Sequence, residues 1–358
     1  MNRNAKQEEQ RIRRMLAWRE RVLRRQPSAS AWGPSYQTAI RAVPGEAPVG
    51  SSPSAFLHRP FQRLMHPLSK AEAVMHALAL YNPSVWEAHD NHVLSPWPCE
   101  HPLASHPLYR SRPWPATRGT IQILNALGRA SSHPRVPRLA VALPAADTAG
   151  PSGKDDKPTM TEISDGNQVI PWIGDLLVFL RDESSDPWLV EWDIKSESGK
   201  HAQPWAGDWR PGKNAAAEAK AETREAAYAP YMADLGIPIH RVAADQIPPV
   251  LGANLVRLCQ RYGHEVALPP TLIGELTDAF RDALRTGELP IDAIRRLVPG
   301  HREQQAATRV LDHCVWERRI AVDLWQPLLI DHPLRPERVD VLQHFSNLFA
   351  RQPHVQPH

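Results

Sequence analysis

Two short apolar runs separated by a turn-rich segment constrain this chain more than any other feature. The runs are residues 175–180 and 188–195, and both are rich in the aliphatic and aromatic residues that strands favour. Residues 181–187 between them carry Ser, Asp and Pro, which favour a turn. The pattern predicts an antiparallel hairpin.

The register of this hairpin brings two acidic residues together. A turn that is symmetric about its centre places Leu180 opposite Trp188, and it therefore places Asp175 opposite Asp193. Cβ atoms of cross-strand partners lie about 4.5–5.5 Å apart, so both carboxylates can reach one divalent cation. Two acids that face each other destabilise a sheet unless a cation offsets their repulsion. Hard oxygen ligands suit Mg²⁺, with Mn²⁺ as the alternative.

Alternation along the second strand assigns its two faces. Glu191, Asp193 and Lys195 point to one face, which we expect to carry chemistry. The apolar residues between them point to the other face, which we expect to be core, and they are Val190, Trp192 and Ile194. Beside a metal ion, Lys195 would orient or deprotonate the attacking water and stabilise the developing charge. The alternative is a surface salt bridge between Asp193 and Lys195 on an ordinary hairpin.

A helix upstream supplies a third acid. Residues 69–81 place apolar side chains at three- and four-residue spacing, and Ser69 stands where an N-cap belongs. Glu72 lies in the first turn of this predicted helix. The predicted catalytic residues are therefore Glu72, Asp175, Asp193 and Lys195, and the predicted metal ligands are the three acids.

The same kind of periodicity predicts the elements around this core. Downstream of the first helix we expect a strand at 85–94, and after the hairpin a helix at 215–235 and a strand at 237–242, which gives an αβββαβ order. The proline-rich region 95–168 holds a strand or helix at 120–127, an apolar segment at 139–143 and a loop at 146–157. The last part holds helices at 271–285, 290–297 and 302–317, then a run at 319–329 suited to a wing. These predict a helix-turn-helix or winged-helix module, with a small bundle for protein contacts as the alternative.

Positive charge is concentrated at the N-terminus. Residues 1–65 hold 12 Lys and Arg against 4 Asp and Glu, although the net charge of the whole chain is only +3. The arginines among residues 11–25 surround apolar side chains, which predicts a short helix that lies along a phosphate backbone or presents a solvated face. Residues 26–62 have no sustained period and predict a connecting arm.

The order of these features resembles a known family of nucleases. Gly174-Asp175, then Asp193-Ile-Lys195 after a hairpin, resembles the PD-(D/E)-x-K core of restriction-type enzymes. Ser69-Lys-Ala-Glu72 on the preceding helix resembles, more narrowly, TnsA, the endonuclease subunit of heteromeric transposases. Residues 225–238 and 241–255 resemble the helix and strand that complete that core and the segment after them. The resemblance covers roughly residues 63–330.

This resemblance implies a function. A member of the family cuts the non-transferred strand, at the 5′ ends of a transposon, by Mg²⁺-dependent hydrolysis of double-stranded DNA. Its partners would be a transposase of the DDE class and a regulatory AAA+ ATPase. A restriction or repair nuclease of the same fold that acts alone is one alternative, and a non-catalytic DNA-binding or scaffold protein is another.

The chain departs from the family pattern in two places. Glycine at position 174 replaces the usual proline, and the interval between Glu72 and the hairpin is long. Other acids therefore remain candidates for the position of Glu72, namely Glu87, Asp90 and Glu100, and Glu191 is a second candidate for the acid of the second strand.

The predicted fold is an α/β protein with a restriction-endonuclease-like core, in which helices flank a mixed sheet, and a C-terminal helical or winged-helix domain. The predicted divisions are a basic arm and linker at 1–62, a nuclease domain at 63–265 with its insertion near 95–168, a helical domain at 266–345 and a disordered tail at 346–358. Three widely spaced cysteines form no C-x-x-C pair, and no apolar run reaches the roughly 18 residues that span a bilayer. We expect a cytoplasmic, nucleoid-associated bacterial protein without membrane partners.

Overall fold

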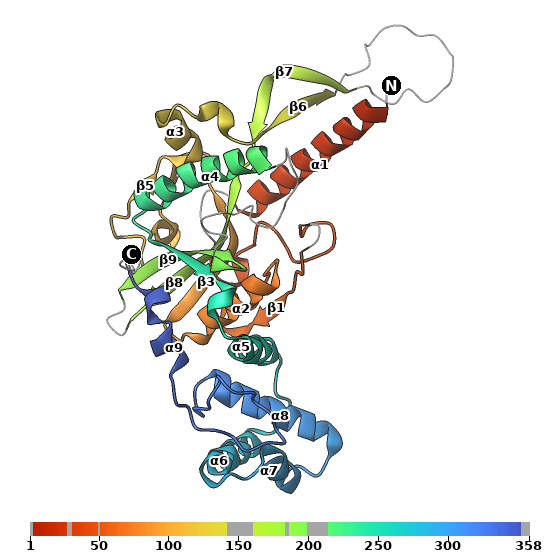
Figure 1. Ribbon diagram of the computed structural model, residues 1–358, viewed down its shortest axis with the longest axis vertical. Coiled ribbons are helices and arrows are strands. Elements are labelled where there is room, and N and C mark those ends of the chain that lie inside the picture. The colour runs from red at the N-terminus through yellow and green to blue at the C-terminus, as the bar shows by residue number, and fades with distance from the viewer. Residues whose placement is uncertain are drawn as a thin grey trace.

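A four-stranded mixed sheet forms the centre of the molecule (Figure 1). The computed structural model describes residues 3–26, 31–48, 51–141, 160–182, 186–198 and 214–351. The strand order is β10-β9-β8-β3, in which β3 (Val85–Leu94) and β9 (Pro187–Lys195) each pair antiparallel with β8 (Trp172–Arg181). β10 (Ile239–Ala243) runs parallel to β9. The protein is therefore a mixed α/β fold with helices on both sides of a mixed sheet, as predicted.

The predicted hairpin and its register are confirmed. β8 and β9 pair from Arg181 with Pro187 to Leu176 with Trp192, and Leu180 lies opposite Trp188. The same register places the next residue of each strand at the end of the ladder, and these residues are Asp175 on β8 and Asp193 on β9.

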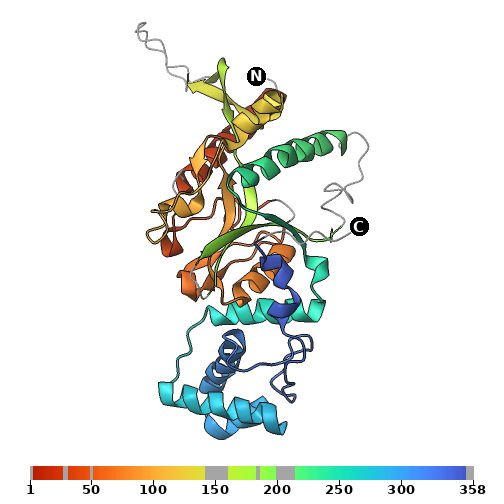
Figure 2. The ribbon, with the colours of Figure 1, turned by 90° about the vertical axis from the view of Figure 1, so that its left-hand side faces the viewer.

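Helices cover the two faces of the sheet (Figures 1 and 2). α2 (Lys70–Tyr81) and α5 (Pro249–Tyr262) cover one face, and α4 (Asn214–Asp234) covers the other. The side chains that fill the first layer include those of Trp192 and Ile194 on β9, so this face is core as predicted. α2 begins after its Ser69 N-cap, as predicted, whereas α5 was not among the predicted elements.

The N-terminal part packs against β3. α1 (Arg3–Arg25) is longer than predicted, and the chain after it returns to the sheet. The hydroxyl of Tyr36 donates to the carbonyl of Asp90 at 2.8 Å, and the hydroxyl of Thr38 donates to the same oxygen at 2.9 Å. The segment predicted as a connecting arm is thus anchored to the edge strand where the structure describes it. The short pair β1 (Phe56–His58) and β2 (Arg63–Met65) leads into α2.

The proline-rich region between β3 and β8 forms small elements of its own. The predicted strand or helix at 120–127 is a helix, α3 (Gly119–Ala126). The apolar segment at 139–143 falls partly in β6 (Arg135–Val141), which pairs with β7 (Met160–Val169). β4 (Cys99–Glu100) pairs with β5 (Ala116–Thr117). The predicted loop at 146–157 lies outside the described residues.

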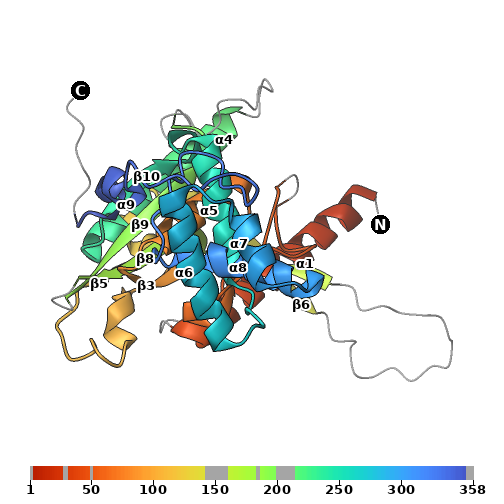
Figure 3. The same cartoon turned by 90° about the horizontal axis from the view of Figure 1, so that it is seen from below.

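The C-terminal helices form a group beyond α5, nearest the viewer in Figure 3. The three predicted helices are confirmed as α6 (Pro270–Thr286), α7 (Pro290–Leu297) and α8 (His301–Trp316). The predicted wing is wrong, because the chain after α8 forms only an isolated bridge between Val322 and Pro336, and no strand lies in the described run 317–340. Throughout the described ranges, no helix has both the length and the apolar character to cross a membrane.

The end of the chain returns from these helices to the sheet. α9 (Val341–His344) precedes a short 3-10 helix whose carbonyl groups face β9. The indole of Trp188 donates to the carbonyl of Phe349 at 2.9 Å, and that of Trp192 donates to Leu348 at 2.8 Å. Part of the predicted disordered tail is therefore a strap on the sheet, since two buried or half-buried indoles need acceptors that the sheet itself does not supply. Residues 352–358 lie outside the described residues.

One buried histidine of α2 predicts a pH dependence of stability. His76 is fully buried, and neither of its ring nitrogens has a hydrogen-bond partner among the described residues. Burial lowers the pKa of His76 from 6.5 to about 4. The folded chain therefore binds fewer protons than the unfolded chain between these values, and the folded state loses stability as pH falls from 6.5 to 4.

His76→Leu removes this penalty. We expect the stability of the variant relative to wild type to rise by about 3 kcal/mol between pH 7 and pH 4. Urea denaturation at a series of pH values measures the difference, and the exposed His264→Leu is the matched control. A difference that stays constant with pH would show that His76 is not held neutral by burial.

Candidate active site

The candidate site lies where β8 and β9 meet α4. Asp175, Leu177 and Phe179 share the face of β8 that α4 covers, and Asp193 lies on the same face of β9. The backbone N–H of Ile194 donates to Asp175 Oδ2 at 2.8 Å, which fixes that carboxylate against the neighbouring strand. The two aspartates that the hairpin register predicts to face each other are therefore on the same side of the sheet.

Lys195 connects the two carboxylates. Its Nζ lies 3.7 Å from Asp175 Oδ2 and donates to Asp193 Oδ1. The lysine side chain is 21% exposed, that of Asp175 is 26% exposed and that of Asp193 is 9% exposed. The cluster is therefore half-buried, and its ammonium offsets the repulsion between two neighbouring acids.

Burial raises the pKa of Asp175. The positive charges of Lys195 and Arg224 act against this effect, whereas the negative charge of Asp193 adds to it. Because burial disfavours the charged form of Asp175, a further cation beside its carboxylate would stabilise that charged form.

Glu72 belongs to the same electrostatic environment but also caps its own helix. Its carboxylate accepts from the N–H of Leu68 and from the hydroxyl of Ser69, both at 2.9 Å, and its own N–H donates to the Ser69 oxygen. These bonds hold the start of α2, which is a structural role that Glu72 performs without any metal. Burial first, and then the charge of Asp175, raise the pKa of Glu72 from 4.5 to about 7.

Glu72→Gln is expected to change stability at high pH, whereas His76→Leu is expected to change it at low pH. A raised carboxyl pKa means that the folded state binds the proton more tightly, so the wild type loses stability as pH rises from 4.5 through 7. The amide oxygen of Gln can still accept from the N–H of Leu68, and its NH2 group can donate to the hydroxyl oxygen of Ser69. We expect the metal-free variant to be more stable than wild type at pH 8.5 by about 1–3 kcal/mol and to match it at pH 4. Thermal unfolding in chelator measures both values, and equal stability at both pH values would contradict the assignment.

The alternative acids lie elsewhere. Glu87 and Asp90 are buried and paired with the guanidinium of Arg63 at 2.9 and 3.1 Å, and Asp90 also accepts from the N–H of His66 at 2.7 Å. Glu100 is exposed on β4. The charge of Asp175 is, after burial, the largest cause that raises the pKa of Glu72.

Glu191 occupies a buried cluster that sequence reasoning missed. The Glu191 carboxylate is fully buried, lies 2.8 Å from His92 Nε2 and accepts from the Tyr228 hydroxyl at 2.6 Å. The face of β9 that we expected to carry only chemistry is therefore also packed, under α4. The Glu191 carboxylate is occupied by His92 and Tyr228. The acid of β9 that forms an ion pair with Lys195 is therefore Asp193.

This cluster explains the glycine at position 174. A Cβ atom built on Gly174 would lie 2.2 Å from His92 Nε2 and 2.7 Å from Glu191 Oε1. Neither atom can move away without breaking the buried pair. Any side chain at position 174, including the proline of the family pattern, is therefore excluded by the packing behind the candidate site.

Arg224 of α4 is a further cation at the site. Its Nη2 donates to the carbonyl of Ile173 at 3.0 Å, and its guanidinium lies over the ring of Tyr228 at 5.3 Å. The charge of Asp175 is the largest influence that raises the pKa of Arg224. The spacing of Arg224 and Tyr228, four residues apart on one helix, is the local signal that points to both.

Several N-terminal arginines already have partners. Arg11 and Arg13 pair with Glu8 and Glu9 on α1, and Arg25 pairs with Glu46 at 2.6 Å. These three are therefore not open to phosphate without exchanging partners. The choice between a phosphate-binding helix and a solvated face remains a prediction for the rest of α1.

The residues of the site fit a divalent cation by their chemistry. Carboxylate oxygens of Asp175 and Asp193 are the ligands that Mg²⁺ prefers, and an ammonium already lies against both. Within residues 3–26, 31–48, 51–141, 160–182, 186–198 and 214–351, no three His, Cys, Asp or Glu side chains are grouped closely enough to form a complete metal site. Asp175 and Asp193, completed by waters, are the donor set that the described part of the chain brings together, whereas Glu72 belongs to α2, which covers the other face of the sheet.

Comparison with known proteins gives no family for the chain. No protein-family model matches it, and no curated protein is similar enough to count as a match.

Proposed function

We propose that this protein is a metal-dependent DNA endonuclease with a restriction-endonuclease-like core. The observation that carries the proposal is the convergence of Asp175, Asp193 and Lys195 at one end of two adjacent strands, on one face of the sheet. Helices on both faces, and a fourth strand parallel to β9, agree with such a core. The set of one ammonium, one half-buried carboxylate and one buried carboxylate suits hydrolysis of a phosphodiester.

Each side chain has a distinct role in this proposal. Asp175 and Asp193 would hold a Mg²⁺ or Mn²⁺ ion, and Glu72 would bind it through a water or accept a proton. A bound divalent ion supplies Lewis acidity to the phosphate and lowers the pKa of a coordinated water. Lys195, whose ammonium lies against both carboxylates, would donate to the attacking water or to a phosphate oxygen. Arg224 adds positive charge beside Asp175 and holds the end of β8 through Ile173.

We further propose that the enzyme works as a subunit of a heteromeric transposase and cuts the non-transferred strand at transposon ends. The support is the order of motifs: a Ser-x-x-Glu helix, a Gly-Asp strand start and an Asp-x-Lys strand end. The partners are a DDE-class transposase and an AAA+ ATPase, and the substrate is double-stranded DNA. The genes that lie beside the one encoding this chain give the first check.

Purified protein on supercoiled plasmid with Mg²⁺ separates the candidate functions. A transposase subunit is expected to leave the plasmid intact alone and to cut transposon ends once its two partners are added. Efficient cutting by the protein alone would support the stand-alone nuclease instead. Full transposition with an Asp175→Ala variant would remove the enzymatic function and leave a DNA-binding or scaffold protein.

A further inference from the structure

Arg224 brings a second positive charge to the candidate site, from α4 rather than from the hairpin. It stands one turn before Tyr228, which packs on the sheet, and its Nη2 donates to the carbonyl of Ile173 at 3.0 Å. Ile173 precedes Asp175 by two residues on β8, a spacing of roughly 7 Å along a strand. The guanidinium is therefore anchored beside the strand end that carries the two aspartates.

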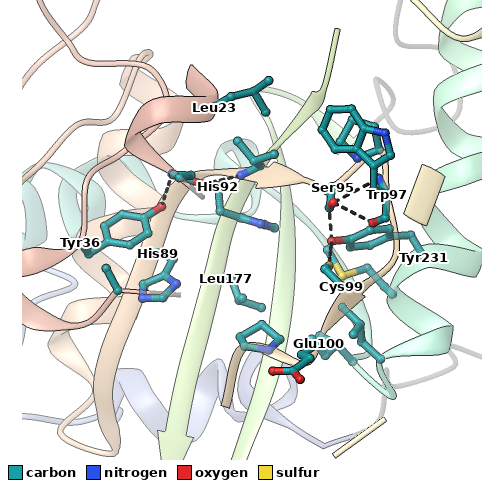
Figure 4. Close-up of a pocket in the computed structure, with 18 of the residues that line it drawn as sticks. Leu23, Tyr36, His89, His92, Ser95, Trp97, Cys99, Glu100, Leu177 and Tyr231 are labelled. Carbon is teal, nitrogen blue, oxygen red and sulfur yellow. Dashed lines mark hydrogen bonds between the residues drawn. The ribbon is translucent and has the colours of Figure 1, made fainter. Parts of the chain in front are cut away.

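A buried network fixes the ring on which this guanidinium rests. The centre of the Tyr228 ring lies 5.3 Å from the guanidinium carbon of Arg224. Tyr228 is buried, and its hydroxyl donates to Glu191 at 2.6 Å. Glu191 in turn lies 2.8 Å from Nε2 of His92, which lies in the wall of the cavity shown in Figure 4. Arg224 is thus held from two sides, by a backbone carbonyl and by an aromatic ring that a hydrogen bond fixes in turn.

Two nitrogens of the same guanidinium remain open. Within the described part of the chain, Nε and Nη1 of Arg224 have no hydrogen-bond partner, and neither belongs to the buried side-chain atoms that lack one. Solvent therefore reaches both nitrogens. Lys195, by contrast, donates to Asp193 and to the carbonyl of Ile194. Arg224 can therefore donate to a further anion without breaking a contact that it makes in the protein.

The charge of the site determines when an anion can approach. Burial acts to lower the pKa of Arg224, but the neighbouring acids, Asp175 first, outweigh burial and raise it, so the guanidinium stays charged. The two aspartates and the two cations, Lys195 and Arg224, together carry no net charge. A divalent ion on the aspartates makes the sum positive, which attracts a phosphate. An anion is therefore expected to bind beside Arg224 together with the metal ion and not without it.

We propose that Arg224 binds a phosphate group of the DNA strand beside the two aspartates when a divalent ion occupies them. This inference rests on the proposed nuclease function and names a residue that holds its substrate. A guanidinium that is already fixed in the protein loses little side-chain freedom when it binds an anion, and its N–H groups suit phosphate oxygens. The alternative is a purely structural role, in which Arg224 only ties α4 to β8.

Binding of a fluorescently labelled DNA duplex measures this contact without cleavage, with Ca²⁺ in place of Mg²⁺. Both ions take oxygen ligands. Arg224→Met is expected to weaken binding by the full chain about tenfold or more, and to lower the slope of log affinity against log salt by about one unit. Arg224→Lys keeps the charge and is expected to restore most of the slope. In chelator without Ca²⁺, the wild type and Arg224→Met are expected to bind alike.

Arg302 provides the matched control. It is exposed on α8, so Arg302→Met removes one positive charge outside the site and is expected to bind DNA as the wild type does. A purely structural Arg224 gives a different pattern, in which Arg224→Met melts at a lower temperature but keeps the wild-type affinity and salt slope while folded. That pattern, an equal loss with Arg302→Met, or no binding of the duplex by the wild type in Ca²⁺ overturns the inference.

Failure of this inference and failure of the proposed function give different results. If Asp175→Asn loses cleavage while Arg224→Met binds DNA as the wild type does, the nuclease stands and the phosphate contact fails. If Asp175→Asn cuts normally, the proposed nuclease function fails, whatever Arg224 binds.

Discussion

Asp175→Asn and Asp193→Asn are each expected to reduce DNA cleavage by about 10³-fold or more. Each substitution removes one negative charge from the pair that Lys195 now neutralises, and it leaves the remaining acid unable to hold a divalent ion alone. Cleavage is measured with radiolabelled transposon ends and the partner proteins, or as nicking of supercoiled plasmid in Mn²⁺.

Stability separates loss of chemistry from loss of fold in these variants. Asn at position 175 can still accept from the N–H of Ile194, and burial raises the pKa of the native Asp175. We therefore expect the melting temperature of Asp175→Asn to equal or exceed that of wild type. Asp278→Asn, on an exposed surface of α6, is the matched control and should cut normally. Wild-type cleavage by either site variant would contradict the assignment.

Lys195→Met is expected to separate metal binding from cleavage. Without metal, the ammonium neutralises both aspartates, so it competes with a divalent ion for the same oxygens. Loss of the ammonium should tighten Mn²⁺ binding severalfold. The two carboxylates then repel each other without a counter-charge, and a bound Mn²⁺ ion relieves that repulsion. Cleavage should nevertheless fall by about 10²–10³-fold, since no donor remains beside the water and the phosphate.

Isothermal titration with Mn²⁺ and the cleavage assay together test the Lys195→Met prediction. Lys220→Met changes an exposed lysine of α4 and serves as the control for loss of one positive charge. A variant that binds Mn²⁺ less well than wild type would mean that Lys195 organises the acids rather than competing for them. A variant that cuts DNA normally would exclude Lys195 from the chemistry.

Local patterns in the sequence predict those elements that neighbouring residues determine. The hairpin register follows from strand alternation and the length of one turn, so Leu180 and Trp188 are correctly paired. α2 follows from a Ser N-cap and helical spacing, and α6 follows from a glycine C-cap in the left-handed conformation. These signals act within a few residues of the chain.

Contacts between distant residues leave no such signal. His92 and Glu191 are 99 residues apart, and nothing local shows that Glu191 is a buried partner rather than an exposed acid. The requirement for glycine at position 174 depends on that same pair. The strap at Leu348 and Phe349 was predicted as disordered, because its binding to β9 relies on backbone carbonyls that any residue possesses.

The candidate site also combines residues that local patterns predict with residues that only distant contacts bring in. Asp175, Asp193 and Lys195 follow from one hairpin, and the structure places them together. Glu72 comes from a helix on the opposite face of the sheet, and the sequence does not reveal that its carboxylate also binds the N–H of Leu68 and the hydroxyl of Ser69. Arg224 joins the site only because α4 crosses the ends of the strands.

Mn²⁺ binding, followed by electron paramagnetic resonance in wild type, Asp175→Asn and Asp193→Asn, tests the central claim most directly. We expect saturable Mn²⁺ binding to the wild type, displacement by excess Mg²⁺, and an affinity at least tenfold weaker in both variants. No saturable binding to the wild type, or the same affinity in all three proteins, would contradict a metal site built from the two facing aspartates.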